Sequence, residues 1–213
     1  MIYSEVSIFR LAIKWRVMIA IVPLFFALTA CATGQNKKQY LQMISMPHVS
    51  APLVLKAWKA TPFALTQLVE GDFQGTRYQA HFEIEWRKQT LTIVGLSLAG
   101  LPLFKIQASE KGTDHRSLIP EAESKTAMDP AWVLSDFLLT IAPMQLLQSG
   151  LSSPDLQAIS NVAQERTLQR QGKTAVSITY SQSGVFAPQI AFKNLELGYD
   201  LSIKNIQFEE LKP

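Results

Sequence analysis

The segment YQAHFEIEWRKQTLTIVGLSLAGLPLFKIQAS (residues 78–109) determines the fold class. Its first nine residues place apolar side chains at every second position, which predicts a β-strand with one buried and one solvated face. A polar turn at residues 87–89 follows, and then a returning strand at 90–98 and a third strand at 101–109. The returning strand is apolar at both alternating sets of positions, so we expect both of its faces to be covered.

A second apolar element, residues 130–149, predicts a helix inside the protein. The Asp-Pro pair at 129–130 suits an N-cap and a first helical position. Pro143 predicts a kink or break, because proline lacks the amide donor that a helix requires. Apolar residues cover nearly the whole circumference, and only Ser135 and Asp136 give the first half a polar side. An ordinary surface helix has a single apolar stripe, so this helix is predicted to be covered on two sides.

The remaining segments indicate further strands and complete the fold class. Apolar alternation at 175–181, 189–199 and 200–211 predicts late strands, while residues 52–73 suit an early helix or strand followed by the first sheet strand. We therefore expect a mainly β protein with a helical insert, an α+β arrangement. A single curved antiparallel sheet with helices on its concave side fits this order.

The N-terminus has the pattern of a bacterial signal peptide. Basic residues precede an uncharged apolar run at 17–28, which is shorter than a membrane-spanning helix. The run leads into Leu-Thr-Ala-Cys at 28–31, which resembles the lipobox of bacterial lipoproteins. Cys31 is the single cysteine, which excludes a disulfide within the chain. The alternatives are a cleaved secretory signal with an incidental cysteine and an uncleaved anchor helix.

The lipobox resemblance implies a three-part chain. Residues 1–30 would be a lipoprotein signal peptide, residues 31–48 a lipidated tether and residues 49–213 the folded domain. Cys31 would carry a covalent diacylglyceryl group on its sulfur and an N-acyl chain. Ala32 stands where aspartate would signal inner-membrane retention, so the resemblance implies an outer-membrane protein facing the periplasm.

Composition excludes a nucleic-acid-binding protein. The formal net charge is +3, but three basic residues and one acidic residue lie within residues 1–30, which leaves +1 for the rest. No basic face is evident. Charged residues make up 17% of the chain and apolar residues 47%, which indicates a surface richer than usual in apolar area.

The sequence offers little for catalysis. Gly95-Leu-Ser97-Leu-Ala99 is one residue short of the G-x-S-x-G nucleophile elbow, and another strand follows it where the elbow requires a helix. His48, His81 and His115 are dispersed, and nothing pairs them with Ser97 or gives them metal-ligand spacing. We expect no enzyme activity, no metal and no cofactor, and a serine esterase is the weakest alternative.

Several short motifs resemble the LolA/LolB-like lipoproteins. They are Trp86-Arg87, residues 95–98, the Gly-Leu-Pro-Leu-Phe run at 100–104 and Trp-Val-Leu-Ser-Asp at 132–136. The similarity is greatest to a branch often encoded in aryl-polyene and related lipid biosynthesis clusters. It implies an incomplete antiparallel β-barrel, lidded by helices on its concave side, that holds the acyl chains of a cargo.

The resemblance and the high content of apolar residues together suggest which residues bind and transfer the cargo. The resemblance implies that the turn containing Leu98 and Leu101 contacts the membrane or the cargo during transfer. The predicted cargo is a lipoprotein acyl chain or a polyene or glycolipid, and the donor would be a periplasmic LolA-like carrier or a lipid exporter. The alternative is an assembly lipoprotein that docks a lipid-export or biosynthetic complex. The residues expected to line the cargo cavity are Phe82, Ile84, Trp86, Ile93, Phe104, Trp132, Leu138 and Ile141.

Overall fold

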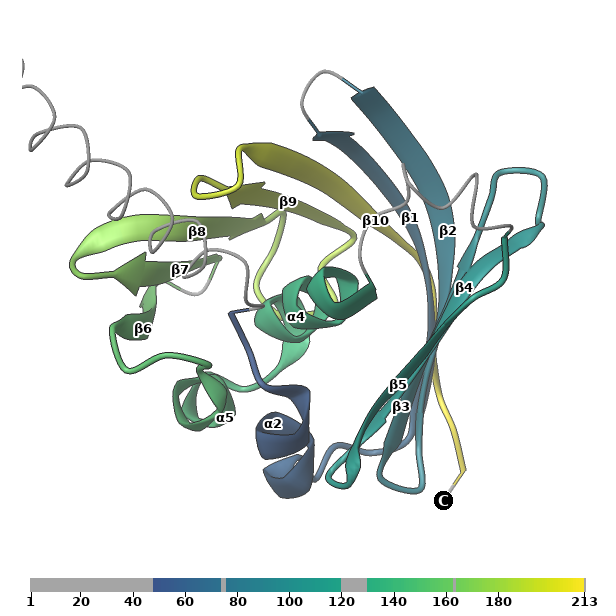
Figure 1. Cartoon of the computed structure of the whole chain (residues 1–213), viewed down its shortest axis with the longest axis horizontal. Helices are drawn as coiled ribbons and strands as arrows, with labels where there is room; N and C mark the ends of the chain where they lie inside the picture. The colour runs from purple at the N-terminus through teal and green to yellow at the C-terminus, as the bar shows by residue number, and fades with distance from the viewer. Residues whose placement is uncertain (1–47, 74–75, 120–129, 163, 213) are drawn as a thin grey trace, which may run out of the picture. The chain divides into compact units, whose positions relative to one another are not determined.

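The computed structural model describes residues 48–73, 76–119, 130–162 and 164–212 (Figure 1). Ten strands in this part form one antiparallel sheet, in the order β5-β4-β3-β2-β1-β10-β9-β8-β7-β6. The predicted signal peptide, Cys31, the tether up to residue 47 and Asp129 lie outside the described residues. The strands are β1 (Phe63–Phe73), β2 (Thr76–Arg87), β3 (Thr90–Leu96), β4 (Pro102–Ser109), β5 (Gly112–Ser117), β6 (Leu156–Val162), β7 (Glu165–Arg170), β8 (Lys173–Tyr180), β9 (Gln189–Asn194) and β10 (Tyr199–Glu210).

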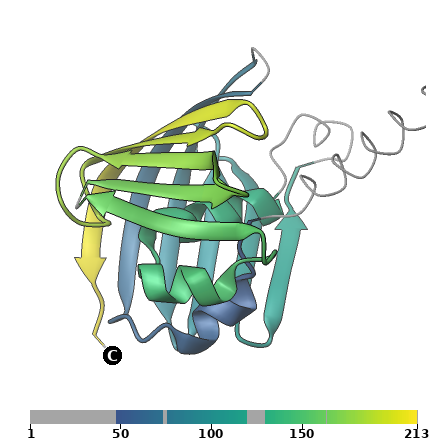
Figure 2. The same cartoon turned by 90° about the vertical axis from the view of Figure 1, so that its left-hand side faces the viewer.

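The first and last strands pair at the middle of the sheet. β1 and β10 are in register from Phe63 opposite Glu210 to Phe73 opposite Tyr199, with one bulge between Thr66 and Gln67. The sheet curves strongly, so that β1–β5 form one wall and β6–β9 face them from the other side (Figures 1 and 2). The expected fold class, an incomplete antiparallel barrel with helices on its concave side, is confirmed.

Three helices lie in the hollow of the sheet: α2 (Ala51–Ala57), α4 (Pro130–Ile141) and α5 (Met144–Gly150). α4 and α5 are separated at Pro143, as the sequence predicts. Every residue of α4 from 133 to 141 is buried, including the Ser135 and Asp136 that the sequence suggests as its polar side. In the described part of the chain, no helix combines the length and apolarity that a membrane crossing requires.

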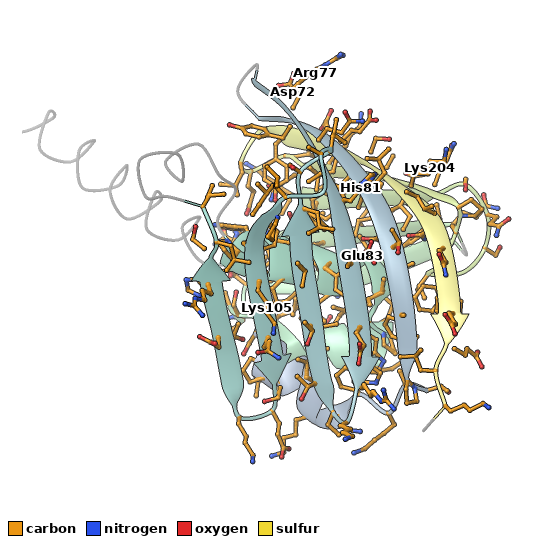
Figure 3. The ribbon with its side chains drawn as sticks, turned by 90° about the vertical axis from the view of Figure 1, so that its right-hand side faces the viewer. Asp72, Arg77, His81, Glu83, Lys105 and Lys204 are labelled. Carbon is orange, nitrogen blue, oxygen red and sulfur yellow. The ribbon has the colours of Figure 1, made fainter. Side chains whose placement is uncertain are left out.

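The two faces of the sheet differ in chemistry. The buried residues Phe82, Ile84 and Trp86 alternate with exposed polar ones along β2, and β4 and β9 repeat the pattern. Figure 3 shows the outer face of β1–β4 and β10, from which charged and polar side chains project, among them His81, Glu83 and Lys105. The apolar interior therefore lies wholly on the concave side.

β3 departs from the expectation that both of its faces are covered. Leu91 and Ile93 are fully buried, but Val94 on the other face is only half-buried. Val94 lies in register between Glu83 on β2 and Lys105 on β4. Long polar side chains of this kind shield apolar neighbours with their methylene groups, so no second layer is needed.

Two further parts of the sequence interpretation are corrected. The alternation at 189–199 does not form one strand, because residues 195–198 turn back into β10. Asn194 Oδ1 accepts hydrogen bonds from the amides of Glu196 (3.2 Å) and Leu197 (2.9 Å) and thereby fixes the turn. β5, β6 and β7 were not expected, and the early segment with an open assignment is the helix α2 followed by β1.

Gly95 provides the space in which two aromatic rings meet on the concave face. It lies between Phe82 on β2 and Phe104 on β4, whose ring centroids are 5.6 Å apart in an edge-to-face arrangement. A Cβ at position 95 would lie 2.4 Å from Cε1 of Phe104. A side chain at this position therefore displaces the Phe104 ring from a packed core.

We expect Gly95→Ala to lower the free energy of unfolding by about 1–3 kcal/mol, as overpacking of a filled core does. Urea denaturation measures the change. Phe104→Leu in the same chain frees the space, so the double variant should lose less stability than the sum of the single variants. Strict additivity would show that the ring and the glycine do not share this space.

Candidate functional site

The C-terminal end of α4 is fastened to one wall of the sheet. Because Pro143 breaks the helix, the last carbonyls of α4 need partners other than the next helical turn. Arg166 on β7 donates from Nη1 to the carbonyls of Leu139 (3.1 Å) and Ala142 (2.8 Å). The Tyr180 hydroxyl on β8 donates to the carbonyl of Thr140 (2.6 Å). A guanidinium at this helix end also interacts favourably with the helix dipole.

Asp136 forms a second link from α4, to β10. The Tyr199 hydroxyl donates a hydrogen bond to Asp136 Oδ2, and Asn194 Nδ2 donates to the Tyr199 oxygen at 3.2 Å. Burial raises the pKa of Asp136 from 3.8 to about 7, and the hydrogen bond from Tyr199 opposes this only in part. Burial and the nearby Asp136 carboxylate raise the pKa of Tyr199, which keeps its hydroxyl a donor. Asp136 Oδ1 is buried and has no hydrogen-bond partner among the described residues.

A third link joins α4 to the start of the described chain. Ser135 Oγ accepts a hydrogen bond from the amide of Val49 (3.2 Å). Next to it, His48 is buried, and its Nε2 donates to Glu196 Oε2 at 3.0 Å. Burial lowers the pKa of His48, and Glu196 opposes this shift. Glu196 also accepts from Arg170 Nε (2.8 Å), so residue 48 belongs to a buried polar network.

These links leave one side of α4 without hydrogen bonds. Within the described residues, every hydrogen bond from residues 133–142 to another element ends on residue 49, β7, β8 or β10. The interface between α4 and the concave side of β1 and β2, called here the seam, is filled mainly by apolar side chains. Apolar contacts are not directional, so the seam can open without leaving a buried hydrogen bond unmade.

A small cavity lies in the seam. Its volume is about 20 Å³, which is enough for a single water molecule. Six of its nine lining residues are apolar, and Asp136 is one of the three polar residues. The lining residues are Gln67, Val69, Phe82, Val133, Asp136, Phe137, Thr140, Leu201 and Ile203.

A larger groove lies on the surface beyond the C-terminal end of α4. Its volume is about 510 Å³, which falls in the range of small-molecule sites. Phe63 contacts Phe186 and Phe208 with ring centroids 5.4 and 5.9 Å apart. Phe63 and the cavity residue Gln67 are both on the concave face of β1, so groove and cavity lie along the same seam. The groove is lined by Ala57, Trp58, Lys59, Ala60, Thr61, Phe63, Ile141, Pro143, Leu146, Val185, Phe186, Phe208 and Glu210.

The structure separates the residues that the sequence suggests for a cargo cavity. Phe82 lines the cavity and Ile141 lines the groove. Trp86 stacks on Trp58 (5.1 Å) and donates to the carbonyl of Ala60 (3.1 Å), so it fixes the connection from α2 to β1. Trp132 is half-buried and lies edge-on to His48. The other candidates, Ile84, Ile93, Phe104 and Leu138, lie in the buried core.

Ser97 serves the turn between β3 and β4. Its Oγ accepts a hydrogen bond from the amide of Leu101 (3.1 Å), and its amide donates to the Leu101 carbonyl (2.8 Å). Leu98 and Leu101 in the same turn are 58% and 65% exposed. Leu118 lies beside the turn, because its amide donates to the Leu103 carbonyl (2.9 Å), and it is also exposed. Among the described residues, no group of three or more potential ligands is placed to hold a metal ion.

A family model described as "Protein of unknown function (DUF3261)" matches residues 64–207, from β1 to β10. The chain belongs to the DUF3261 family. No curated protein matches its sequence.

Some solved structures are also similar to this chain. A LolA superfamily protein from Nitrosomonas europaea is 8% identical, with 78% of this chain and 95% of that chain covered and a TM-score of 0.41. A DUF1329 family protein from Desulfovibrio piger is 10% identical, with coverages of 78% and 93% and a TM-score of 0.42. A proposed outer membrane lipoprotein-sorting domain from Vibrio parahaemolyticus is 7% identical, with coverages of 70% and 85% and a TM-score of 0.39.

Sequence reasoning missed most of the groove and the polar part of the cavity in this DUF3261 chain. Phe186 and Phe208 stand in segments with no distinctive motif. The pairing of β1 with β10 brings Phe208 to Phe63, and the connection between β8 and β9 brings Phe186 there. Asp136 did give a signal, since it is an acidic residue in an otherwise apolar helix. An acidic residue on a helix buried on two sides is a candidate functional group.

Asp136 makes the stability of the DUF3261 domain depend on pH. Since its pKa rises from 3.8 to about 7 on folding, the native state binds the proton more tightly than the unfolded chain. Stability from this group is present at low pH and is lost as pH rises, by about 4 kcal/mol between pH 4 and pH 8. His48 acts in the opposite direction below its ordinary pKa of 6.5, because burial disfavours its protonated form.

Asp136→Asn isolates the contribution of the carboxyl, because it retains the shape and cannot ionise. We expect the free energy of unfolding of the wild type, minus that of Asp136→Asn, to fall steadily from pH 4 to pH 8. Urea denaturation at several pH values measures it, and the contribution of His48 cancels in the difference. A difference that is constant with pH would contradict the assignment.

Proposed function

We propose that this protein is an outer-membrane lipoprotein that binds a hydrophobic molecule in the seam between α4 and the sheet and passes it on. The chain would be anchored through lipid on Cys31 and would face the periplasm. It would act without catalysis and without a cofactor other than its own lipid. Burial of apolar surface would supply the affinity, because apolar contacts are not directional and therefore suit a lipid chain.

The observation that carries the proposal is the one-sided attachment of α4. The hydrogen bonds of Arg166, Tyr180 and Tyr199 hold the helix to β7, β8 and β10, while its face toward β1 and β2 is mainly apolar. An aromatic groove opens at one end of that face, and a cavity lies farther in. A lipid chain that enters from the groove can therefore replace the apolar contacts between α4 and the sheet with apolar contacts of its own. Pro143, at the end of α4 beside the groove, places the break in the helix where the seam would open.

The groove is tested by placing a charge in it. Phe208 lines the groove and is 42% exposed, whereas Ile206 on the same strand is 53% exposed and does not line it. We expect Phe208→Glu to reduce labelling by a photo-activatable long-chain lipid about tenfold, because bound apolar chains would desolvate the carboxylate. Ile206→Glu, the matched control, should be labelled like the wild type.

The measurement uses the full chain in phosphatidylcholine vesicles that contain the photo-activatable lipid, with labelling quantified by intact mass. Equal labelling of the two variants would place binding outside the groove. If the wild type were labelled no more than an unrelated vesicle-anchored protein, cargo binding would be rejected. If such an unlabelled chain captured a stable protein partner, the alternative function as an assembly lipoprotein would be favoured instead.

The exposed turn at Leu98 and Leu101 would make the contact through which cargo is passed on. Leu195, in the turn between β9 and β10, is exposed to the same extent as Leu98, at 58%, and provides a matched control. We expect Leu101→Glu to slow transfer of a fluorescent lipid to acceptor vesicles by about three- to tenfold, since a charge opposes insertion at the bilayer surface. The amount of lipid bound should not change. A rate equal to that of Leu195→Glu would exclude the turn from transfer.

A further inference from the structure

One residue that lines the cavity in the seam carries a polar atom with no partner in the described part of the chain. Asp136 is 4% exposed and lines the cavity, and no described residue forms a hydrogen bond with its Oδ1. The other oxygen, Oδ2, accepts from Tyr199. A buried acceptor left unpaired lowers stability by about 1–3 kcal/mol, so such atoms in native proteins call for a partner from outside the chain.

The neighbouring polar groups are already engaged. Gln67 Nε2 donates to Asn205 Oδ1 at 2.8 Å, and Thr140 Oγ1 donates to the Phe137 carbonyl at 2.7 Å. Neither side chain donates to Asp136 Oδ1. The remaining walls of the cavity are apolar, which leaves this oxygen as the unsatisfied acceptor among its lining side chains.

We propose that Asp136 Oδ1 accepts a hydrogen bond from a hydroxyl group carried by an otherwise apolar cargo. The cavity has room for one water molecule, and a hydroxyl group is of the same size. A hydroxyl also pairs with either protonation state of the carboxyl, as a donor to the carboxylate or as an acceptor from the acid. A long-chain amine would have to bury an ammonium ion among apolar side chains, at a cost of several kcal/mol in desolvation.

The place of Asp136 in the seam sets the orientation of the cargo. From Phe63 in the groove to Gln67 at the cavity, β1 rises about 13 Å. The hydroxyl would occupy the inner end of this path and the apolar chain would extend toward the groove. The inference rests on the proposed function, because the seam must open to admit the chain.

The test compares three photo-activatable probes with the same chain: a primary alcohol, its methyl ether and the corresponding amine. Each is titrated against the full chain in phosphatidylcholine vesicles, and half-maximal labelling gives the apparent affinity. The pH is kept above the Asp136 pKa of about 7, so that the carboxyl is ionised and cannot donate to the ether oxygen. We expect the alcohol to bind about five- to tenfold more tightly than the ether, as one hydrogen bond to a buried acceptor predicts, and more tightly than the amine. Asp136→Leu should abolish the difference between alcohol and ether.

Ser135→Ala is the matched control, because it removes a buried hydrogen bond from the same helix without touching the cavity. It should retain the preference for the alcohol. Equal binding of alcohol and ether to the wild type would overturn the inference while leaving cargo binding intact, and this result requires no variant to fold. A preference that survives in Asp136→Leu, or tighter binding of the amine, would also overturn it. Failure of all three probes to bind would remove the proposed function together with the inference.

Discussion

The arrangement of the whole interior depends on how one apolar helix ends inside a curved sheet. α4 ends at Ile141, just before the exposed Pro143, and residues 139–142 are buried, so water does not reach its last carbonyls. Arg166 and Tyr180 satisfy them from β7 and β8. These strong, directional bonds assign the helix to one wall, and only packing remains to hold it against the other. The two sides of α4 therefore differ in the kind of force that acts there, although both are buried.

The second constraint is the buried carboxyl of Asp136 on the same helix. A core built for stability alone would place an aliphatic side chain at position 136, because a carboxyl there must be either neutralised or desolvated. The protein instead gives Asp136 a hydrogen bond from Tyr199, which Asn194 supports, and among the described residues one oxygen of Asp136 remains unpaired. Residues that lower stability in this way are expected at functional positions rather than in ordinary cores.

The sequence predicts those features that depend on neighbouring residues. Alternation along residues 78–86 indicates β2 because period-two burial is local, and Pro143 indicates a break because its ring excludes helix geometry. β7 has no such pattern: its sequence, Glu-Arg-Thr-Leu-Gln-Arg, is mostly polar, and it is a strand because β6 and β8 pair with it. The turn at 195–198 escapes detection because the side chain of Asn194, rather than a glycine pair, sets it.

The central pairing of β1 with β10 also determines when the protein can fold. The two strands are separated by more than a hundred residues, yet each supplies the other's hydrogen bonds along its whole length. Contacts between such distant segments form slowly, because a long loop must be closed before they contribute. A chain that is synthesised from its N-terminus cannot complete the middle of this sheet until β10 has emerged. Loss of β10 would split the sheet at its centre, so completion of the sheet depends on the last of the described strands.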